Sequence, residues 1–453
     1  MNYLISLLVV LQACFYLSRV SKTRGKDNWV ITLIYFEVIY NLIINFIVGN
    51  TVLPSMFNYV SDAVMIAILF GALRQNGGCV TGIPRSMLAI AGGLWLLSLI
   101  SYALNLYSPL LYLWGFRNNF RFIVFAMVCA CYLEREDFEL ILEILFGFFL
   151  TNVAVVTWQF LILDRNRLSF GDFISGLYNN GAERGGNEAL AWLISIVCIW
   201  QTVKYLNEGG NTGRLALVWA GALYMAAVAE IKLVIVVLVL GSMLALMRCR
   251  KSGRSVALVI FSVLTVFLGI QLMYLIFPLF KDLFTIEQML SYVTREEGYA
   301  TLSGGLDRLT ALPYVFTNYL LHWPQKLFGI GLGNADYSSF SFLTSDFYRL
   351  HSWTGYSYFS SAFLTLELGA VGFAGFIVWY GNFARQALVA RVRNIQEKTV
   401  RDTVLILSLI AVVMIFSNQS LKMESSAYMV TCVLSFVFLL NREDDHTPLA
   451  KER

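Results

Sequence analysis

Charged residues are scarce in this chain. Only 14% of its 453 residues are Asp, Glu, Lys or Arg, whereas 58% are hydrophobic. Apolar windows of about 18 to 20 residues recur from end to end, which is the length that a helix needs to cross the hydrocarbon core of a bilayer. An open sheet is excluded because its edge amides would have no partners in hydrocarbon, and the windows are too uniformly apolar to alternate as barrel strands do. The composition therefore predicts an all-α, polytopic transmembrane bundle.

Residues that hold metals or nucleotides are also rare. The chain has three histidines, at positions 322, 351 and 446, and neither a His-x-x-x-His nor a Cys-x-x-Cys spacing, so we expect no zinc site. It has no Gly-x-x-x-x-Gly-Lys-Ser/Thr loop, which argues against direct use of ATP. No Asp-x-Asp pair occurs in the connections assigned below to the outer face, which argues against a metal-diphosphate site. We therefore expect neither a cofactor nor a bound metal.

Cysteine and net charge exclude two further features. The seven cysteines lie inside apolar segments or in connections assigned below to the cytoplasm, so no outer disulfide framework is expected. The net charge of +4 reflects the basic residues that orient membrane segments, and it implies no nucleic-acid partner.

The apolar windows predict about 12 to 14 membrane spans. The expected spans are 2–18, 29–48, 56–73, 87–106, 118–133, 138–162, 188–203, 215–229, 233–247, 255–278, 358–380, 402–417 and 425–441. They divide the chain into N-terminal transmembrane helices (1–162), an outer loop (163–187), central transmembrane helices (188–280), a long loop that we expect to be partly helical (281–357), C-terminal transmembrane helices (358–441) and a cytoplasmic tail (442–453).

The distribution of Lys and Arg predicts the orientation of these spans, because short cytoplasmic connections carry an excess of basic residues. Most of the 33 basic residues fall in one alternating set of short connections, which we assign to the cytoplasm. That set comprises 19–28, 74–86, 134–137, 204–214, 248–254, 385–401 and the tail. The N-terminus, the connections 107–117 and 163–187, the hairpin around residue 231 and the long loop then face outward.

The few cations expected on the outer face form a candidate site. Arg184 comes directly before a span, Lys232 lies in a hairpin between two spans, and Arg308 lies in the long loop. Each alone is equally consistent with a solvated or snorkelling surface charge. Together they suit the diphosphate of a lipid-linked substrate, because charge-assisted hydrogen bonds are strong where water is scarce.

Glycines mark one turn in the long loop. Gly329, Gly331 and Gly333 form a Gly-x-Gly-x-Gly pattern, but it opens no strand-helix-strand unit of the kind that binds dinucleotides. We expect these glycines to let the loop turn tightly against a helix.

Five segments together resemble a known superfamily. In Gly305–Leu309 and Pro324–Asn334, an Arg precedes a Pro-x-x-x-x-Gly-x-Gly segment, and Glu367–Gly372 has a Glu-x-Gly-x-x-Gly pattern at the start of the next span. Arg184–Asn187 and Glu230–Lys232 precede them in the chain. Their order and spacing resemble the O-antigen polymerase and O-antigen ligase superfamily of bacterial glycosyltransferases. The resemblance covers roughly residues 180 to 375.

The resemblance implies an inner-membrane enzyme with a GT-C-like arrangement and an active site facing the periplasm. Such enzymes take a glycan from undecaprenyl diphosphate and place it on a sugar hydroxyl, with inversion and without metal. The products are O-antigen of lipopolysaccharide, capsule or exopolysaccharide. The implied partners are the lipid-linked donor and acceptor, the bilayer, and a chain-length regulator and flippase of the same pathway.

The resemblance also implies roles for individual residues. Positive charge must meet the leaving diphosphate, and a base must take the proton of the acceptor hydroxyl. Arg308 is the expected catalytic cation, His351 is the first candidate for the base, and Glu230 is the second. The residues assigned to diphosphate or substrate binding are Arg184, Asn187, Lys232, Arg308 and Tyr314.

Two departures from the superfamily pattern bear on the reaction. Lys232 stands where members often have Arg, which keeps the charge but loses the bidentate fork. Tyr358 occupies the position of the ligase His, and His351 lies further upstream. These departures favour a polymerase over a ligase, which remains the first alternative.

A transporter or flippase is the second alternative, because it would have the same hydropathy and would use acids inside the spans, such as Glu37, Asp62 and Glu143. Against it, the chain shows no internal repeat and carries its notable polar residues at the outer boundary. A membrane scaffold without enzymatic activity is the third alternative.

Overall fold

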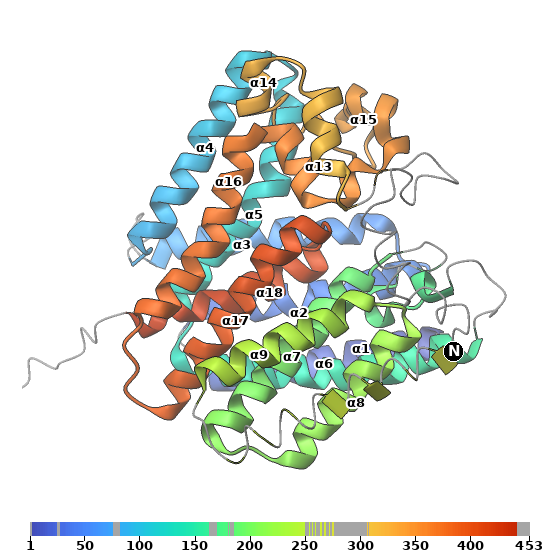
Figure 1. The fold of residues 1–453 in the computed structure, drawn as a ribbon, viewed down its shortest axis with the longest axis vertical. Helices are drawn as coiled ribbons and strands as arrows, with labels where there is room; N and C mark the ends of the chain where they lie inside the picture. The colour runs from blue at the N-terminus through green and yellow to red at the C-terminus, as the bar shows by residue number, and fades with distance from the viewer. Residues whose placement is uncertain are drawn as a thin grey trace, which may run out of the picture.

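The computed structural model describes residues 2–24, 28–75, 82–162, 170–179, 181, 185–249, 306 and 308–441, together with isolated positions between 253 and 275. These residues form helices and connections without any strand, as the composition predicts (Figure 1). Within them, eight helices are long and apolar enough to cross a membrane. They are α1 (Asn2–Thr23), α2 (Trp29–Asn50), η1 with α3 (Ser55–Tyr59 and Val60–Gln75), α4 (Arg85–Asn105), α6 (Arg135–Ile162), α7 (Asn187–Glu208), α16 (Ser360–Val389) and α17 (Ile395–Ser417).

Four further apolar helices complete the bundle described here. They are α5 (Pro109–Tyr132), α8 (Thr212–Val228), α9 (Lys232–Arg248) and α18 (Glu424–Leu440). The described part of the long loop is partly helical, as expected. It contains α13 (Ala311–Tyr314), η5 (Val315–Tyr319), α14 (Trp323–Phe328), η6 (Ser341–Leu343), α15 (Asp346–His351), η7 (Ser352–Thr354) and η8 (Tyr356–Tyr358). Two short turns, η2 (Phe170–Phe173) and η3 (Gly176–Tyr178), precede α7.

Each predicted span except one overlaps a helix of the structure. The exception, 255–278, lies outside the described residues apart from isolated positions. Two boundaries differ markedly, because α5 begins at Pro109 instead of near residue 118 and α16 ends at Val389 instead of near residue 380. Hydropathy places the start of α5 too late because it counts Arg117 and Arg121 as charges, whereas acidic side chains neutralise both of them in the fold.

The C-terminal helices form the centre of the bundle. α18 packs against α2, α5, α7 and α17, and almost all of its residues are buried. α16 packs along α17 on one side and against α4 on the other, so that α4, α16 and α5 lie together in the upper half of Figure 1. A helix that is apolar on all faces and buried against protein, as α18 is, belongs in the middle of such a bundle.

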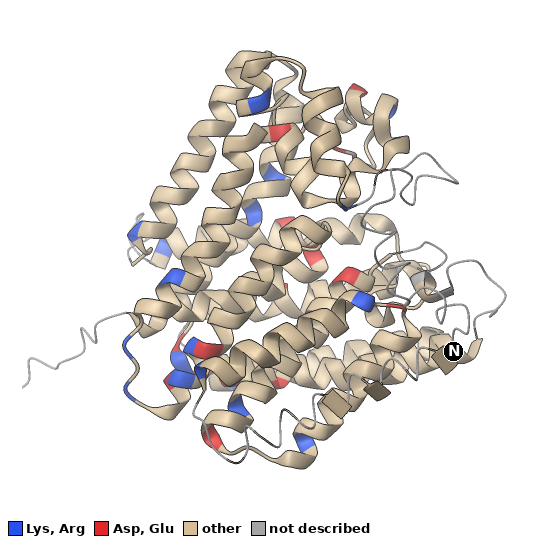
Figure 2. Ribbon diagram, in the orientation of Figure 1, with Lys and Arg blue, Asp and Glu red and all other residues tan. Residues whose placement is uncertain are grey.

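The connections with many basic residues gather at one end of the bundle. Arg24, after α1, pairs with Glu134 at 2.5 Å, and Lys204, near the end of α7, pairs with Glu139 at 2.6 Å. Figure 2 shows many of the charged segments at the lower left, where α16 ends and α17 begins. The structure thus sorts these connections as the basic-residue count does. The assignment of that end to the cytoplasm stays a prediction.

The opposite end of the bundle carries the connections predicted to face outward. There the Asn2 amide donates to Asn50 Oδ1 at 3.1 Å, which joins the start of α1 to the end of α2. The described part of the long loop lies over α4, α5 and α16, where α14 contacts both α4 and α16 (Figure 1). Its expected position in the periplasm and the GT-C-like arrangement stay predictions.

The glycine turn of the long loop interlocks with a break in α16. The Ile330 N–H donates to the Leu366 carbonyl at 2.8 Å, and the Gly331 N–H donates to the Glu367 carbonyl at 3.0 Å. Two segments that are separate in the sequence therefore form one structural unit.

The close approach of these two backbones requires glycine. A Cβ on Gly329 would lie 2.3 Å from the Glu367 carbonyl carbon, and one on Gly333 would lie 1.9 Å from the Leu111 oxygen. Gly369, inside α16, has a φ of +69°, and a Cβ there would also meet backbone of the loop. The expectation that the glycines turn the loop against a helix is confirmed.

Candidate functional site at the end of the bundle that carries the long loop

Backbone hydrogen bonds bring the segment of Arg308 next to the segment of His351. The Leu306 N–H donates to the Thr354 carbonyl at 2.7 Å, and the Thr354 hydroxyl donates to the His351 carbonyl at 2.8 Å. The Tyr319 hydroxyl bonds Thr354 Oγ1 at 3.2 Å and thereby joins the same group. Two candidate catalytic residues, more than forty positions apart in the sequence, therefore come from adjoining turns.

Arg308 extends from this turn toward the membrane helices. Its side chain is exposed, and its Nε donates to the carbonyl of Ser417, the last residue of α17, at 3.1 Å. The carboxylate of Glu188, in the first turn of α7, attracts it electrostatically. Arg308 thus lies where the long loop, α7 and α17 meet.

The His351 ring packs in an aromatic cluster. It lies 4.5 Å from the Phe347 ring and 4.9 Å from the Tyr319 ring, measured between centroids, and the residue is half-buried. Tyr314 contacts Tyr319 at 5.3 Å. Burial raises the pKa of the Tyr319 phenol, which favours its neutral hydroxyl. The buried Tyr356 also packs against this cluster, which serves as the core of the loop.

Asn187 and Glu230 are brought together by hydrogen bonds to backbone. The Asn187 amide donates to the carbonyls of Gly171 at 3.2 Å and Ala229 at 3.1 Å, and Glu230 Oε1 accepts from the Gly171 N–H at 3.1 Å. Glu230 has a φ of +55°, and its carbonyl accepts from the Lys232 N–H at 3.0 Å. The Asn187 amide and one Glu230 oxygen therefore hold the connections between α6, α7, α8 and α9 in place.

The described residues that the sequence assigned to a site lie at one end of the bundle. Asn187 directly precedes Glu188 on α7, the Glu188 carboxylate attracts Arg308 electrostatically, and the turn of Arg308 is hydrogen-bonded to that of His351. Arg184 lies outside the described residues. The described part of the long loop thus reaches the end of α17 through Arg308.

A second cluster consists of charges between helices, and of its members the sequence analysis named only Asp62, as an acid that a transporter would use. Arg117 of α5 bonds both carboxylate oxygens of Asp62 in α3, at 2.8 and 2.5 Å, and also reaches Glu424 of α18 at 3.1 Å. Arg121, one turn further along α5, pairs with the same Glu424. The spacing of the two arginines four residues apart in an otherwise apolar window was the available sequence signal, because it places them on one face of a helix.

Lys422 links this cluster to the long loop. Its ammonium lies 3.5 Å from Asp336 Oδ2 and 3.0 Å from the centroid of the Phe363 ring, and Asn118 donates to the same Asp336 oxygen at 2.7 Å. The residue is in the connection between α17 and α18, two positions before Glu424. The connection between α17 and α18 therefore leads from Lys422, which pairs with Asp336 of the long loop, directly to Glu424 of the charged cluster.

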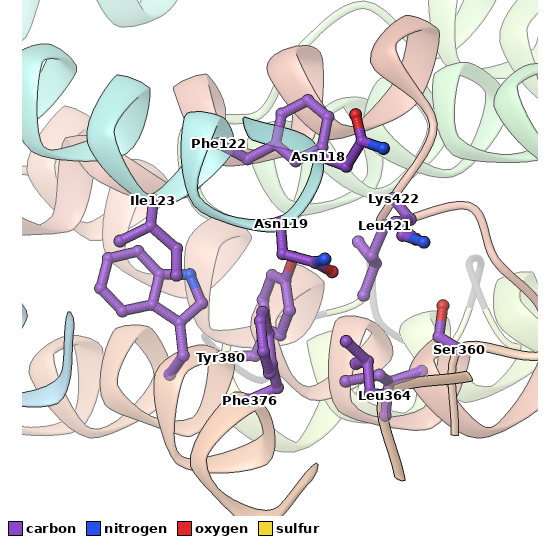
Figure 3. Close-up of a pocket in the computed structure, with 12 residues that line it drawn as sticks. Asn118, Asn119, Phe122, Ile123, Ser360, Leu364, Phe376, Tyr380, Leu421 and Lys422 are labelled. Atoms are coloured by element: carbon purple, nitrogen blue, oxygen red, sulfur yellow. The ribbon is translucent and has the colours of Figure 1, made fainter. Parts of the chain in front are cut away.

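A narrow pocket lies beside Lys422 (Figure 3). Figure 3 shows Asn118 and Asn119 projecting from α5 on one side, with Ser360 and Tyr380 of α16 on the other. Its free volume is ≈ 20 Å³, which is room for about one water molecule. The buried Ser360 hydroxyl lacks a hydrogen-bond partner among the described residues, so the polar end of the pocket suits such a water.

Glu367 of α16 holds the glycine turn (Gly329–Gly333) in place. Its carboxylate is fully buried and accepts from the Gly333 N–H at 2.8 Å and from the Asn119 amide at 3.3 Å. The acid of the Glu-x-Gly-x-x-Gly pattern is therefore a structural anchor that ties the loop to α5 and α16.

Among the residues that the structure describes, no group of three or more His, Cys, Asp or Glu side chains is arranged to hold a metal ion. The chain matches no protein-family model. No curated protein matches it. Its long apolar helices are compatible with a multi-pass membrane protein.

Proposed function

We propose that this protein polymerises oligosaccharide repeat units linked to undecaprenyl diphosphate, by metal-independent, inverting glycosyl transfer at the periplasmic face of the bacterial inner membrane. The observation that carries the proposal is the position of Arg308. This exposed cation is held at the end of α17 and in the same loop unit as His351. The site therefore combines a cation suited to a diphosphate with a group able to accept a proton.

The chemistry follows from this pairing. A glycan on a lipid diphosphate is already activated, because the diphosphate leaves readily once its developing charge is neutralised. Arg308 supplies that positive charge, and the acceptor hydroxyl loses its proton to a base at the same site. Two exposed aromatic side chains of the same loop, Tyr337 and Trp353, offer flat apolar faces that suit the apolar faces of sugar rings.

The experiment is a polymerisation assay with purified protein in detergent or nanodiscs and a synthetic undecaprenyl-diphosphate repeat unit. We expect a ladder of longer glycans on a gel, without ATP and in the presence of EDTA. Arg308→Ala is the test variant, and Lys326→Ala, at another basic position of the same loop, is the matched control. A ladder that disappears with EDTA and returns with Mg²⁺ would contradict the proposal of cations as the diphosphate partners.

Cells that lack the protein separate the proposal from its nearest alternative. Loss of a polymerase leaves surface glycan that is one repeat long, whereas loss of a ligase leaves full-length chains on the lipid carrier. The ligase alternative predicts transfer of one complete polysaccharide to a lipid A-core or protein acceptor in the same purified system, with no ladder.

The ion pairs among α3, α5 and α18 give a specific reason to keep transport as a second candidate. Arg117, Asp62 and Glu424 are paired inside apolar helices, and ionisable residues in such positions often mark transport pathways. Deletion of a flippase would trap single repeat units on the cytoplasmic side. Movement of a fluorescent lipid-diphosphate glycan across liposomes that contain the purified protein would favour this candidate.

A further inference from the structure

We propose that Glu188 is the general base for the acceptor hydroxyl, an inference that rests on the polymerase function proposed above. The sequence analysis did not select this residue. Three features of the structure point to it: its position beside Arg308, a carboxylate oxygen left without a hydrogen bond, and the engagement of the two bases that the sequence did select.

Glu188 and Arg308 are anchored on the same short stretch of chain. Arg308 Nε donates to the Ser417 carbonyl, and the backbone of Gln419 lies close enough to the Glu188 carboxylate to stabilise its charge. One turn further along α7, Trp192 Nε1 donates to Ser420 Oγ at 2.8 Å, so this face of the helix packs on the connection after α17. The carboxylate and the guanidinium therefore both lie near residues 417–420 and attract one another electrostatically.

One oxygen of the Glu188 carboxylate is able to accept a further hydrogen bond. Its Oε2 has no hydrogen-bond partner among the residues that the structure describes, although the atom is buried. A buried carboxylate oxygen that lacks a donor is costly to maintain, because desolvation of the charge is not repaid by hydrogen bonding. Such a group at a site is well suited to accept a proton from a substrate hydroxyl.

The other two candidates for the base, Glu230 and His351, make structural contacts of their own. Glu230 Oε1 accepts from the Gly171 N–H and so holds the connection before α7. The His351 ring is packed against Phe347 and Tyr319, in the core of the loop. Of the three, Glu188 has the most direct relation to Arg308, which meets the leaving group.

The reaction step balances without any co-reactant. Arg308, an exposed side chain, binds the donor diphosphate. The acceptor hydroxyl oxygen attacks the anomeric carbon, its proton passes to Glu188 Oε2, and the bond from the anomeric carbon to the diphosphate oxygen breaks. The electron pair of that bond remains on the diphosphate, where the Arg308 charge stabilises it, and Glu188 later releases its proton to water.

The experiment compares Glu188→Gln, Glu188→Asp and wild type in the polymerisation assay, with Glu208→Gln as matched control. Glu208 lies at the other end of α7 and also has a buried oxygen that lacks a partner among the described residues. We expect Glu188→Gln to lower turnover by about a hundredfold or more, on the scale of losing a general base. Binding of the lipid-diphosphate donor, measured by fluorescence, should change little, and Glu208→Gln should resemble wild type.

The pH profile separates a base from a structural residue. Wild-type turnover should fall on the acidic side as the base becomes protonated, and this limb should vanish in Glu188→Gln and be retained in Glu188→Asp, whose carboxylate is set back by one methylene. If Glu188→Gln does not fold, Glu188→Ala carries the test, and wild-type turnover by that folded variant would refute the proposal.

Three outcomes would overturn the inference alone: wild-type turnover by Glu188→Gln, equal loss of donor binding and turnover in that variant, or an unchanged acidic limb. The first would exclude a catalytic role, and the other two would assign Glu188 to positioning Arg308. Absence of a ladder with the wild-type protein would instead refute the proposed function. The two failures are therefore distinguishable.

Discussion

Substitution of Gly333 by Ala tests the interlock between the glycine turn and the membrane helices. Gly333 has a φ of +78°, and an added Cβ would lie 1.9 Å from the Leu111 carbonyl oxygen and 2.9 Å from the Gly115 nitrogen. Both neighbours are backbone of α5 and its N-terminal turn, so neither can rotate away as a side chain does. The loop and the helix must separate for the methyl group to fit.

Two costs add in this variant. The left-handed backbone costs a residue with a Cβ about 1 to 2 kcal/mol relative to glycine. Overpacking of a tight contact adds about 1 to 3 kcal/mol. We therefore expect Gly333→Ala to lower the free energy of unfolding by about 2 to 5 kcal/mol, the sum of these two terms.

Gly355→Ala is the matched control, because it isolates the backbone cost. Gly355 has a φ of +69°, but the nearest atoms to an added Cβ belong to the ring of Tyr358, at 3.0 and 3.2 Å. The Tyr358 side chain is 64% exposed and is free to turn, so this variant should lose only about 1 to 2 kcal/mol.

Thermal unfolding of the purified variants in one detergent, followed by tryptophan fluorescence and by retention on gel filtration, measures the difference. Gly333→Ala should unfold at a clearly lower temperature than Gly355→Ala, and both should unfold below wild type. Equal unfolding temperatures for the two variants would show that the close approach of loop and helix contributes no stability, and the interlock would be refuted.

Three further predictions concern charge and orientation. Glu424→Gln should lower the free energy of unfolding by about 3 to 5 kcal/mol in the same assay, because it leaves two largely buried arginines short of a partner. Asp346→Asn, at an exposed ion pair, should change the free energy of unfolding by less than about 1 kcal/mol. Equal effects of the two substitutions would contradict this prediction. Arg308→Ala should lower turnover in the polymerisation assay about a hundredfold or more, and Arg308→Lys should recover only part of it, since a point charge cannot replace the planar fork; full activity of the alanine variant would remove the residue from the site. In a cysteine-free background, a cysteine at the exposed Ser339 should react with an impermeant thiol reagent added outside spheroplasts, and one at the exposed Thr212 should not; the reverse pattern would invert the predicted orientation.

Hydropathy alone located the helices, because the requirement to bury about 30 Å of helix in hydrocarbon acts on each segment separately. The predicted spans at residues 29–48 and 188–203, for instance, lie within helices Trp29–Asn50 and Asn187–Glu208. The sorting of basic connections to one end was likewise available, because it depends on a count and not on contacts. The glycine turn of Gly329–Gly333 was also recognisable, since close backbone approach and positive φ favour one residue type.

The partners of the polar residues were decided by the tertiary structure. Nothing local shows that Arg117 meets Asp62 and Glu424, because the three lie on different helices far apart in the sequence. The same is true of Glu367, which the pattern flagged but whose carboxylate finds its donors in the glycine turn and in α5.

Glu188 shows most clearly which contacts cannot be predicted from the sequence. In the sequence it is one acidic residue at the start of an apolar helix, where acids are common because they favour the helix N-terminus. Its relation to Arg308 arises only when the connection between α17 and α18 folds against α7. Hydrophobic length is a property of a segment and can be summed along the chain, whereas a site is a meeting of side chains whose distances depend on how all the segments pack.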